Sequence, residues 1–296
     1  MTAITRIDVP VRGGSLAAFR FGAPDPDATL VLAAHGITAN SRSWLPVARA
    51  LDGRAQLIAP DLRGRGESRR LPEPFGMAAH AADLIAVLDH VGAERAVLAG
   101  HSMGAYVAAR VGADHPNRLE AAVLVDGGLV LPGSEGVDPQ AFLDAFLGPS
   151  IERLRMRFES PEAYRAFWRD HPAFKRTGVS DEDLAAFADH DLVGDPPELR
   201  SSVAEGAVRA DGGELLEGSG DATALAAPAT LLRAPRGLQN GPDPMVPAET
   251  AADWASEAPD KREVVEVAGV NHYTITLGPG ARAVADAVAA RGPADP

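Results

Sequence analysis

The sequence predicts an α/β fold with a mostly parallel central sheet, helices on both faces and a helical cap inserted between two core strands. Short apolar runs bounded by Gly, Pro and Asp alternate with longer amphipathic stretches in the first and last parts of the chain. Buried parallel strands are continuous apolar runs, and the helices that cover them carry apolar residues at helical spacing. The middle of the chain lacks this alternation. We therefore expect a core of residues 1–132 and 226–296 and a cap of residues 133–225.

The apolar runs are the predicted strands of the sheet. Helical spacing of apolar residues predicts helices over residues 77–91 and 103–113, and residues 281–290 are expected to form a closing helix. Residues 15–21 are expected to add an antiparallel strand at the edge. The predicted buried strands are residues 29–34, 55–59, 96–99, 121–125, 229–232 and 263–267.

The predicted cap has no clear buried strand and is rich in aromatic residues at helix-like spacing. We expect most of them to pack the cap against itself, and a minority that face inward to line an apolar pocket. These residues are Phe142, Phe146, Phe158, Tyr164, Phe167, Trp168, Phe174 and Phe187.

The composition excludes several classes of partner. With 41 acidic and 28 basic residues the formal charge is -13, which repels nucleic acid. The run of Arg63, Arg65, Arg69 and Arg70 is expected to be a solvated loop with one or two weak ion pairs. There is no cysteine, and residues 1–10 lack the apolar core of a signal peptide. No window reaches the roughly 18 apolar residues of a membrane span. We expect a cytoplasmic protein that binds neither nucleic acid nor membranes.

The most specific motif is a Gly-x-Ser-x-Gly pentad, formed by Gly100, His101, Ser102, Met103 and Gly104. It directly follows a predicted buried strand and directly precedes a predicted helix, as a nucleophile elbow requires. Such a turn exposes the middle side chain above the sheet edge, and the flanking glycines leave room for the crossing backbone. The start of the helix presents the Met103 N–H as an oxyanion donor. Ser102 is therefore the predicted nucleophile.

A second loop has the same relation to its strand. His35 and Gly36 end the predicted strand at residues 29–34, and the loop that they open is expected to supply the Ile37 N–H as the second oxyanion donor. His35 has a competing role, in which it only ties the loop down, and the two roles are compatible. We assign no proton transfer to His35.

The predicted general base is His272, in a loop after the last predicted strand and before the last helix. A serine hydroxyl is a poor nucleophile unless a neighbouring imidazole takes its proton during attack. The third member is expected to be a carboxylate that orients this imidazole. Asp126 directly follows the strand at residues 121–125, whereas residues 233–242 separate Asp243 from its strand. Asp126 is preferred by a narrow margin, and both carboxylates stay candidates.

With these motifs the chain resembles the α/β-hydrolase superfamily, specifically its single-chain esterase, lactonase, C–C hydrolase and cofactor-free haloperoxidase branch. Residues 61–68, Asp-Leu-Arg-Gly-Arg-Gly-Glu-Ser, are similar to a segment common after an early core strand in that branch. The resemblance covers residues 1–132 and 226–296. It hardly extends to residues 133–225.

The resemblance bears on the acid and on the type of chemistry. Most relatives carry the acid after the strand that follows the cap, in an Asp-x-x-Val-Pro setting that residues 243–247 match. Others, including zearalenone-type lactonases, take it one strand earlier, which corresponds to Asp126. Because the elbow holds Ser102 rather than Asp, the resemblance does not imply the chemistry of haloalkane dehalogenases or epoxide hydrolases.

The leading hypothesis is a serine hydrolase that cleaves a carboxylic ester or lactone of a small organic substrate with an apolar part, through an acyl-enzyme. C–C bond hydrolysis and cofactor-free haloperoxidase or perhydrolase chemistry use similar residues and remain alternatives. A non-catalytic ligand-binding protein on a hydrolase scaffold is the outside alternative. The sequence has no clustered metal-ligand spacing, so no metal and no organic cofactor is expected. The oligomeric state is left open, a homodimer being one option.

Overall fold

The computed structural model describes residues 2–23, 25, 27–131, 138–216 and 222–292. Its centre is an eight-stranded sheet with the order β1-β2-β4-β3-β5-β6-β9-β10. The pairs β1–β2 and β2–β4 are antiparallel, and every other pair in this sheet is parallel. The strands are β1 (Ile4–Val11), β2 (Gly14–Phe21), β3 (Leu30–Ala34), β4 (Gln56–Pro60), β5 (Ala96–His101), β6 (Leu119–Val125), β9 (Ala229–Arg233) and β10 (Arg262–Glu266).

The six apolar runs predicted as buried strands form β3, β4, β5, β6, β9 and β10. The prediction of burial is wrong for β10, which is an edge strand of the sheet with only Arg262 buried. The antiparallel strand expected at residues 15–21 is confirmed as β2, but its edge position is wrong. The edge strand on this side of the sheet is β1, which pairs with β2 along its whole length. Only Val9 of β1 is buried, and the charged residues Arg6 and Asp8 interrupt its apolar pattern, which is why the sequence did not indicate a strand there.

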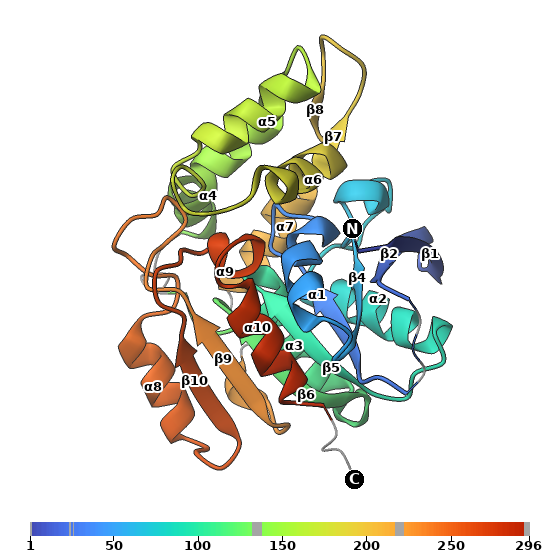
Figure 1. Ribbon diagram of the computed structural model, residues 1–296, viewed down its shortest axis with the longest axis vertical. Coiled ribbons are helices and arrows are strands. Elements are labelled where there is room, and N and C mark those ends of the chain that lie inside the picture. Colours follow the sequence, from blue (N-terminus) through green and yellow to red (C-terminus); the bar gives the residue numbers. More distant parts are fainter. Residues whose placement is uncertain (1, 24, 26, 132–137, 217–221, 293–296) are drawn as a thin grey trace.

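Helices cover both faces of the sheet, as predicted (Figure 1). Side chains of α2, α3 and α8 pack in one apolar cluster and those of α1, α9 and α10 in the other. Strand β5 contributes to both, with Leu98 on one face and Val97 and Ala99 on the other, because successive side chains of a strand point to opposite faces. These helices are α1 (Leu45–Leu51), α2 (Met77–His90), α3 (Met103–Asp114), α8 (Ala248–Ser256), α9 (Thr274–Leu277) and α10 (Ala281–Ala289).

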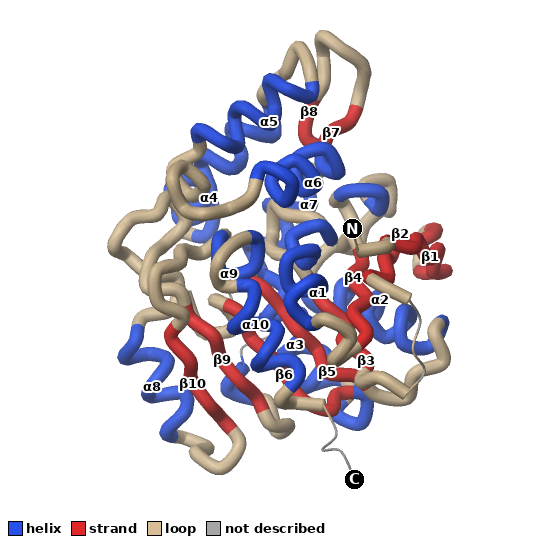
Figure 2. Tube along the Cα trace, in the orientation of Figure 1, coloured by secondary structure: helices blue, strands red, loops and turns tan. Residues whose placement is uncertain are grey.

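A helical insert lies between β6 and β9 and stacks on one end of the sheet (Figures 1 and 2). Three of its helices begin at side-chain caps, in which Asp138, Ser160 and Ser180 accept hydrogen bonds from first-turn amides. We use "helical insert" for α4 (Pro139–Arg155), α5 (Pro161–Asp170), α6 (Asp181–Asp191), the hairpin of β7 (Leu192–Val193) and β8 (Arg200–Ser201), and α7 (Glu205–Leu216).

The insert occupies the segment in which the sequence predicts a helical cap. The predicted first boundary, at residues 132 and 133, lies outside the described residues, so the division into core and cap stays a prediction. Throughout the described ranges, no helix combines the length and the apolar character that crossing a bilayer requires.

Most of the aromatic residues predicted for the cap pack against one another. Phe158, Tyr164, Trp168, Phe174 and Phe187 belong to one buried cluster, centred on the Trp168 ring. The side chains of Phe142 and Phe146 lie outside the described residues.

Buried charges fasten the insert to the core. Asp211 of α7 lies 2.5 Å from the Arg65 guanidinium and 3.0 Å from His80 Nε2, and all three side chains are fully buried. Arg63, next to Arg65, forms a second buried pair with Asp83 at 2.7 Å. The expectation of a solvated arginine loop is therefore wrong for these two arginines.

Helix α6 makes a second tie to the core. His190 Nε2 lies 2.7 Å from the buried carboxylate of Asp61, which also accepts hydrogen bonds from the Ser41 and Glu67 amides. Burial by itself would raise the pKa of Asp61, but His190, His35 and the Glu67 amide together outweigh burial and lower this pKa to about 2. The Asp61 carboxylate is therefore ionised at neutral pH.

Replacing Asp211 by Ala is expected to destabilise the fold by about 3–5 kcal/mol, because it leaves the buried Arg65 charge without its partner. The measurement is the free energy of unfolding in urea. The control is Asp114→Ala, which removes an exposed pair with Arg110 within α3 and is expected to cost about 0.5 kcal/mol or less. Equal costs for the two variants would contradict the structural role of Asp211.

Candidate active site

Ser102 occupies the sharp turn between β5 and α3, with φ 53° and ψ -122°. This left-handed backbone is strained for a residue with a side chain. A Cβ atom at Gly100 would lie 2.1 Å from the Gly104 carbonyl oxygen, and one at Gly104 would lie 2.0 Å from the Ala34 carbonyl oxygen. Both glycines of the pentad are therefore required by close backbone approach, and the turn leaves Ser102 half-exposed.

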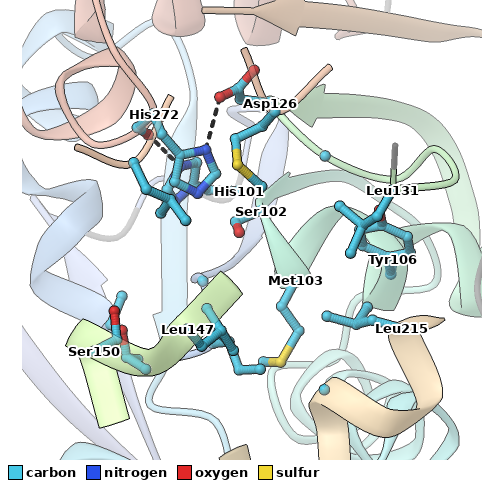
Figure 3. A pocket seen from close by; sticks show the side chains of 18 of the residues that line it. His101, Ser102, Met103, Tyr106, Asp126, Leu131, Leu147, Ser150, Leu215 and His272 are labelled. Atoms are coloured by element: carbon cyan, nitrogen blue, oxygen red, sulfur yellow. Dashed lines mark hydrogen bonds and ion pairs between the residues drawn. The ribbon is translucent and has the colours of Figure 1, made fainter. Parts of the chain in front are cut away.

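His272 and Asp126 form a buried pair, with 2.7 Å between His272 Nδ1 and Asp126 Oδ2 (Figure 3). The other carboxylate oxygen of Asp126 accepts a hydrogen bond of 3.0 Å from the Ala234 amide. Asp126 is therefore held from two sides, at the end of β6 and beside the end of β9. With the carboxylate at Nδ1, the neutral imidazole carries its proton on that nitrogen and leaves Nε2 as an acceptor.

Asp243, the other candidate acid, is exposed on the loop between β9 and α8. Among the described residues it makes no hydrogen bond to His272. The chain that leads to Asp243 contacts the backbone next to the imidazole instead, because Arg236 bridges to Asn271 and its carbonyl accepts the His272 amide at 3.0 Å. The structure brings Asp126, not Asp243, to His272.

Both predicted oxyanion donors lie beside Ser102. Ile37 and Met103 line the same pocket as Ser102 and His272, and Met103 is the first residue of α3, where the backbone N–H has no partner within the helix. Gly36 packs so closely that a Cβ there would lie 3.3 Å from Ser102 Cβ. In the described part of the chain, no hydrogen bond takes up the N–H of Ile37 or Met103.

His35 ties the oxyanion loop down. Its Nδ1 donates to the Gly36 carbonyl at 2.8 Å, and its Nε2 accepts from the Leu62 amide at 3.0 Å. Burial lowers the pKa of His35 to about 4, so the ring is neutral at physiological pH. Because Gly36 C=O and Ile37 N–H belong to one peptide unit, this bond fixes the direction of the Ile37 N–H.

His101 is a site residue that the sequence analysis named only as part of the pentad. Its Nε2 donates to the His272 carbonyl oxygen at 2.7 Å, and the two rings lie 4.7 Å apart. Burial, followed by the nearby His272, holds the pKa of His101 well below its usual range. The neutral ring therefore fixes the His272 backbone. No sequence signal distinguishes this role, because it depends on contact between residues 171 positions apart.

Two arginines also hold the oxyanion loop, and neither was predicted to do so. Arg65 Nε donates to the Ile37 carbonyl at 2.9 Å, and Arg153 of α4 donates to the Thr38 carbonyl at 3.2 Å. Each guanidinium is paired with a buried aspartate of the insert, Arg65 with Asp211 and Arg153 with Asp191. The conformation of the oxyanion loop therefore depends on the insert.

The pocket above Ser102 is lined mainly by aliphatic side chains. They include Leu143 and Leu147 from α4 and Leu215 from α7 (Figure 3). None of the predicted cap aromatics whose side chains are described lines it, so the expectation that some of them would is wrong for those residues. They pack behind the pocket instead. Within the described ranges, no group of three or more His, Cys, Asp or Glu side chains is arranged to hold a metal.

Curated relatives match part of the chain. Putative carbamate hydrolase RutD of Klebsiella pneumoniae (strain 342) is 36% identical over 37% of this chain and 41% of its own length. Two proteins of Mycobacterium tuberculosis match to a similar extent. Lipase LipV is 35% identical, over 45% of this chain and 51% of the length of LipV. Epoxide hydrolase A is 39% identical, over 42% of this chain and 39% of the length of the epoxide hydrolase. The matches thus span about half or less of each relative.

Two further comparisons, with a solved structure and with a family of proteins, cover most of the chain. The crystal structure of E-2-(acetamidomethylene)succinate hydrolase superposes with a TM-score of 0.78, covering 97% of this chain and 99% of that one, at 21% identity. This likeness shows the fold alone. The family described as the alpha/beta hydrolase fold matches residues 29–279. The chain therefore belongs to the α/β-hydrolase fold family.

Proposed function

We propose that the protein is a serine hydrolase that cleaves a carboxylic ester or lactone of a small organic substrate with an apolar part. One observation carries the proposal: Ser102 lies on a strained elbow, in a mainly apolar pocket, with a histidine that a buried carboxylate orients. The names of the relatives include a lipase and a putative carbamate hydrolase, which agrees with attack on an acyl carbonyl.

The first half of the reaction forms an acyl-enzyme. Ser102 Oγ attacks the carbonyl carbon while its proton passes to His272 Nε2. Asp126 stabilises the imidazolium that forms, and the N–H groups of Ile37 and Met103 hold the negative oxygen of the tetrahedral intermediate. When the intermediate collapses, the leaving alcohol takes the proton from His272. For a lactone, this alcohol stays on the acyl chain.

The second half releases the acid. A water molecule gives a proton to His272 Nε2 and attacks the acyl carbon through the same oxyanion site. Collapse of the second intermediate returns the proton to Ser102 Oγ and frees the carboxylic acid. In this scheme His101 and His35 act as positioning residues, because they hold the backbone of the base and of an oxyanion donor without exchanging protons.

We further propose that the helical insert acts as a cap that selects the substrate. Leu143 and Leu147 lie one turn apart on α4, and both line the pocket, as does Leu215 of α7. These side chains form the part of the pocket that the superfamily core does not supply. An acyl or aryl group of apolar character fits such a surface.

Replacing Ser102 by Ala is expected to lower kcat/KM by about a thousandfold or more, as loss of a triad nucleophile does. The assay uses p-nitrophenyl esters of graded acyl length and simple lactones. Ser256→Ala, an exposed serine at the end of α8, is the matched control and is expected to keep full activity. Equal rates in the parent and Ser102→Ala would remove the proposed nucleophile. Retention of a ligand without turnover would favour a binding role.

Asp126→Asn and Asp243→Asn form a matched pair of the same chemical change. Asp126→Asn is expected to lower kcat by roughly 10³–10⁴, because the amide no longer stabilises the imidazolium or its correct tautomer. Asp243→Asn is expected to change kcat by less than about twofold, as exposed substitutions do. A large loss in Asp243→Asn, with activity kept in Asp126→Asn, would reverse the assignment of the acid.

A further inference from the structure

The wall of the pocket carries hydroxyl groups among its apolar side chains. Thr38, Ser150 and Tyr273 line the pocket, and the Tyr273 side chain lies next to the hydroxyl groups of Thr38 and Ser150. We call these three residues the hydroxyl cluster. In Figure 3, Ser150 lies on one side of Ser102, while Leu131 and Leu215 lie on the other. Leu147 lies beside Ser150 in the same view, so a bound substrate meets hydroxyl groups and aliphatic side chains together on that side.

The hydroxyl cluster has a donor to spare. Three hydroxyl groups carry three hydrogens, and contacts of the Tyr273 hydroxyl with the other two can take up two of them at most. In the described part of the chain, no further acceptor is recorded for the third hydrogen. Burial raises the pKa of Tyr273, so its hydroxyl stays protonated at neutral pH. One O–H thus remains to donate into the pocket.

A buried cation, Arg153, lies behind the hydroxyl cluster. Arg153 is buried, bonds the Thr38 carbonyl and interacts electrostatically with Tyr273. His171, the other basic group near the Tyr273 ring, has its pKa lowered to about 4 by burial and then by Arg153, and is neutral. Arg153 is therefore the cation next to the hydroxyl cluster, and the buried Asp191 carboxylate balances its charge.

The acceptor is expected to be neutral. Arg153 already pairs with Asp191 at 2.7 Å and with the Tyr164 hydroxyl at 2.5 Å, and it does not itself line the pocket. Within the described ranges, no lysine or arginine side chain reaches the pocket surface. A carboxylate in this place would lose its hydration without gaining an ion pair, which is costly.

We propose that the hydroxyl cluster binds a second, neutral oxygen of the substrate, such as a ketone or ester carbonyl, apart from the carbonyl that Ser102 attacks. This inference rests on the proposed hydrolase function. The preferred substrate is then an ester or lactone that carries an additional oxo group. The apolar lining alone would instead select a substrate with a plain aliphatic chain.

The test compares matched substrates on the full-length protein. p-Nitrophenyl hexanoate and p-nitrophenyl 5-oxohexanoate place the oxygen in the acyl part, and hexyl butyrate and 5-oxohexyl butyrate place it in the alcohol part. The parent is expected to favour the oxo member of at least one pair by roughly three- to tenfold in kcat/KM, as one neutral hydrogen bond allows. The p-nitrophenyl monoester of adipic acid, which is charged, is expected to react more slowly than the oxo ester.

Two variants test whether the hydroxyl cluster causes the preference for the oxo substrate. Tyr273→Phe and Ser150→Ala are expected to reduce the oxo preference toward one, and Ser150 is half-buried on α4, so its truncation spares the fold. Tyr106→Phe is the matched control, because its hydroxyl donates to the Leu129 carbonyl on the apolar side of the pocket. It is expected to leave the preference unchanged.

Failure of the inference and failure of the proposed function are distinguishable. Turnover that depends on Ser102, with no oxo preference in either pair or with faster cleavage of the adipate, overturns the inference and leaves the proposed hydrolase function intact.

If no substrate is turned over, calorimetry with Ser102→Ala compares the binding of 2-heptanone with that of 2,6-heptanedione. Tighter binding of the diketone that Tyr273→Phe abolishes supports the hydroxyl cluster, and equal binding overturns it.

Discussion

The position of the Asp126 carboxylate is the constraint on which the rest of the site depends. One oxygen faces His272 and the other binds the Ala234 amide, so a single side chain joins the ends of β6 and β9 to the loop of the base. Asp126 itself has φ 49°, a conformation that is costly outside glycine and persists only where surrounding contacts impose it. Two strained residues, Ser102 and Asp126, thus end neighbouring parallel strands at the same edge of the sheet. The core of the protein holds both in place.

Around Ser102, His272 and Asp126, buried neutral and charged side chains form hydrogen bonds to the backbone and hold it in position. His35 and Arg65 hold consecutive carbonyls of the oxyanion loop, and His101 holds the carbonyl of His272. Burial keeps both of these histidines neutral near pH 7, so each offers one donor nitrogen. The proposed oxyanion donor Ile37 and the proposed base His272 are therefore held in place through their backbones. Such preorganisation is the main source of electrostatic catalysis in enzymes of many kinds.

The sheet and the elbow were predictable because their signals are local. Continuous apolar runs mark strands that are buried on both faces, and the pentad around Ser102 meets its required context within a few residues. The edge strand β1 escaped prediction, because an edge strand tolerates charged residues such as Arg6 and Asp8 on its exposed face. Helix α8 was missed as well, although Trp254 anchors it in the core.

The parts that were not predictable depend on long-range geometry. The choice between Asp126 and Asp243 turns on the path of residues 234–242, which the Arg236 bridge to Asn271 directs past His272. The burial of Arg65 depends on Asp211, which lies far along the chain in the insert. Similarly, aromatic spacing predicted a packed cap but not which helix face lines the pocket, and α4 supplies leucines there.

The contacts between insert and core also bear on how the pocket opens to solvent. Lifting the insert away as a rigid body would separate Arg65 from Asp211 and His190 from Asp61. Both contacts are buried, so such a movement has to break them together and hydrate all four side chains. Local movements at the mouth of the pocket leave both contacts in place.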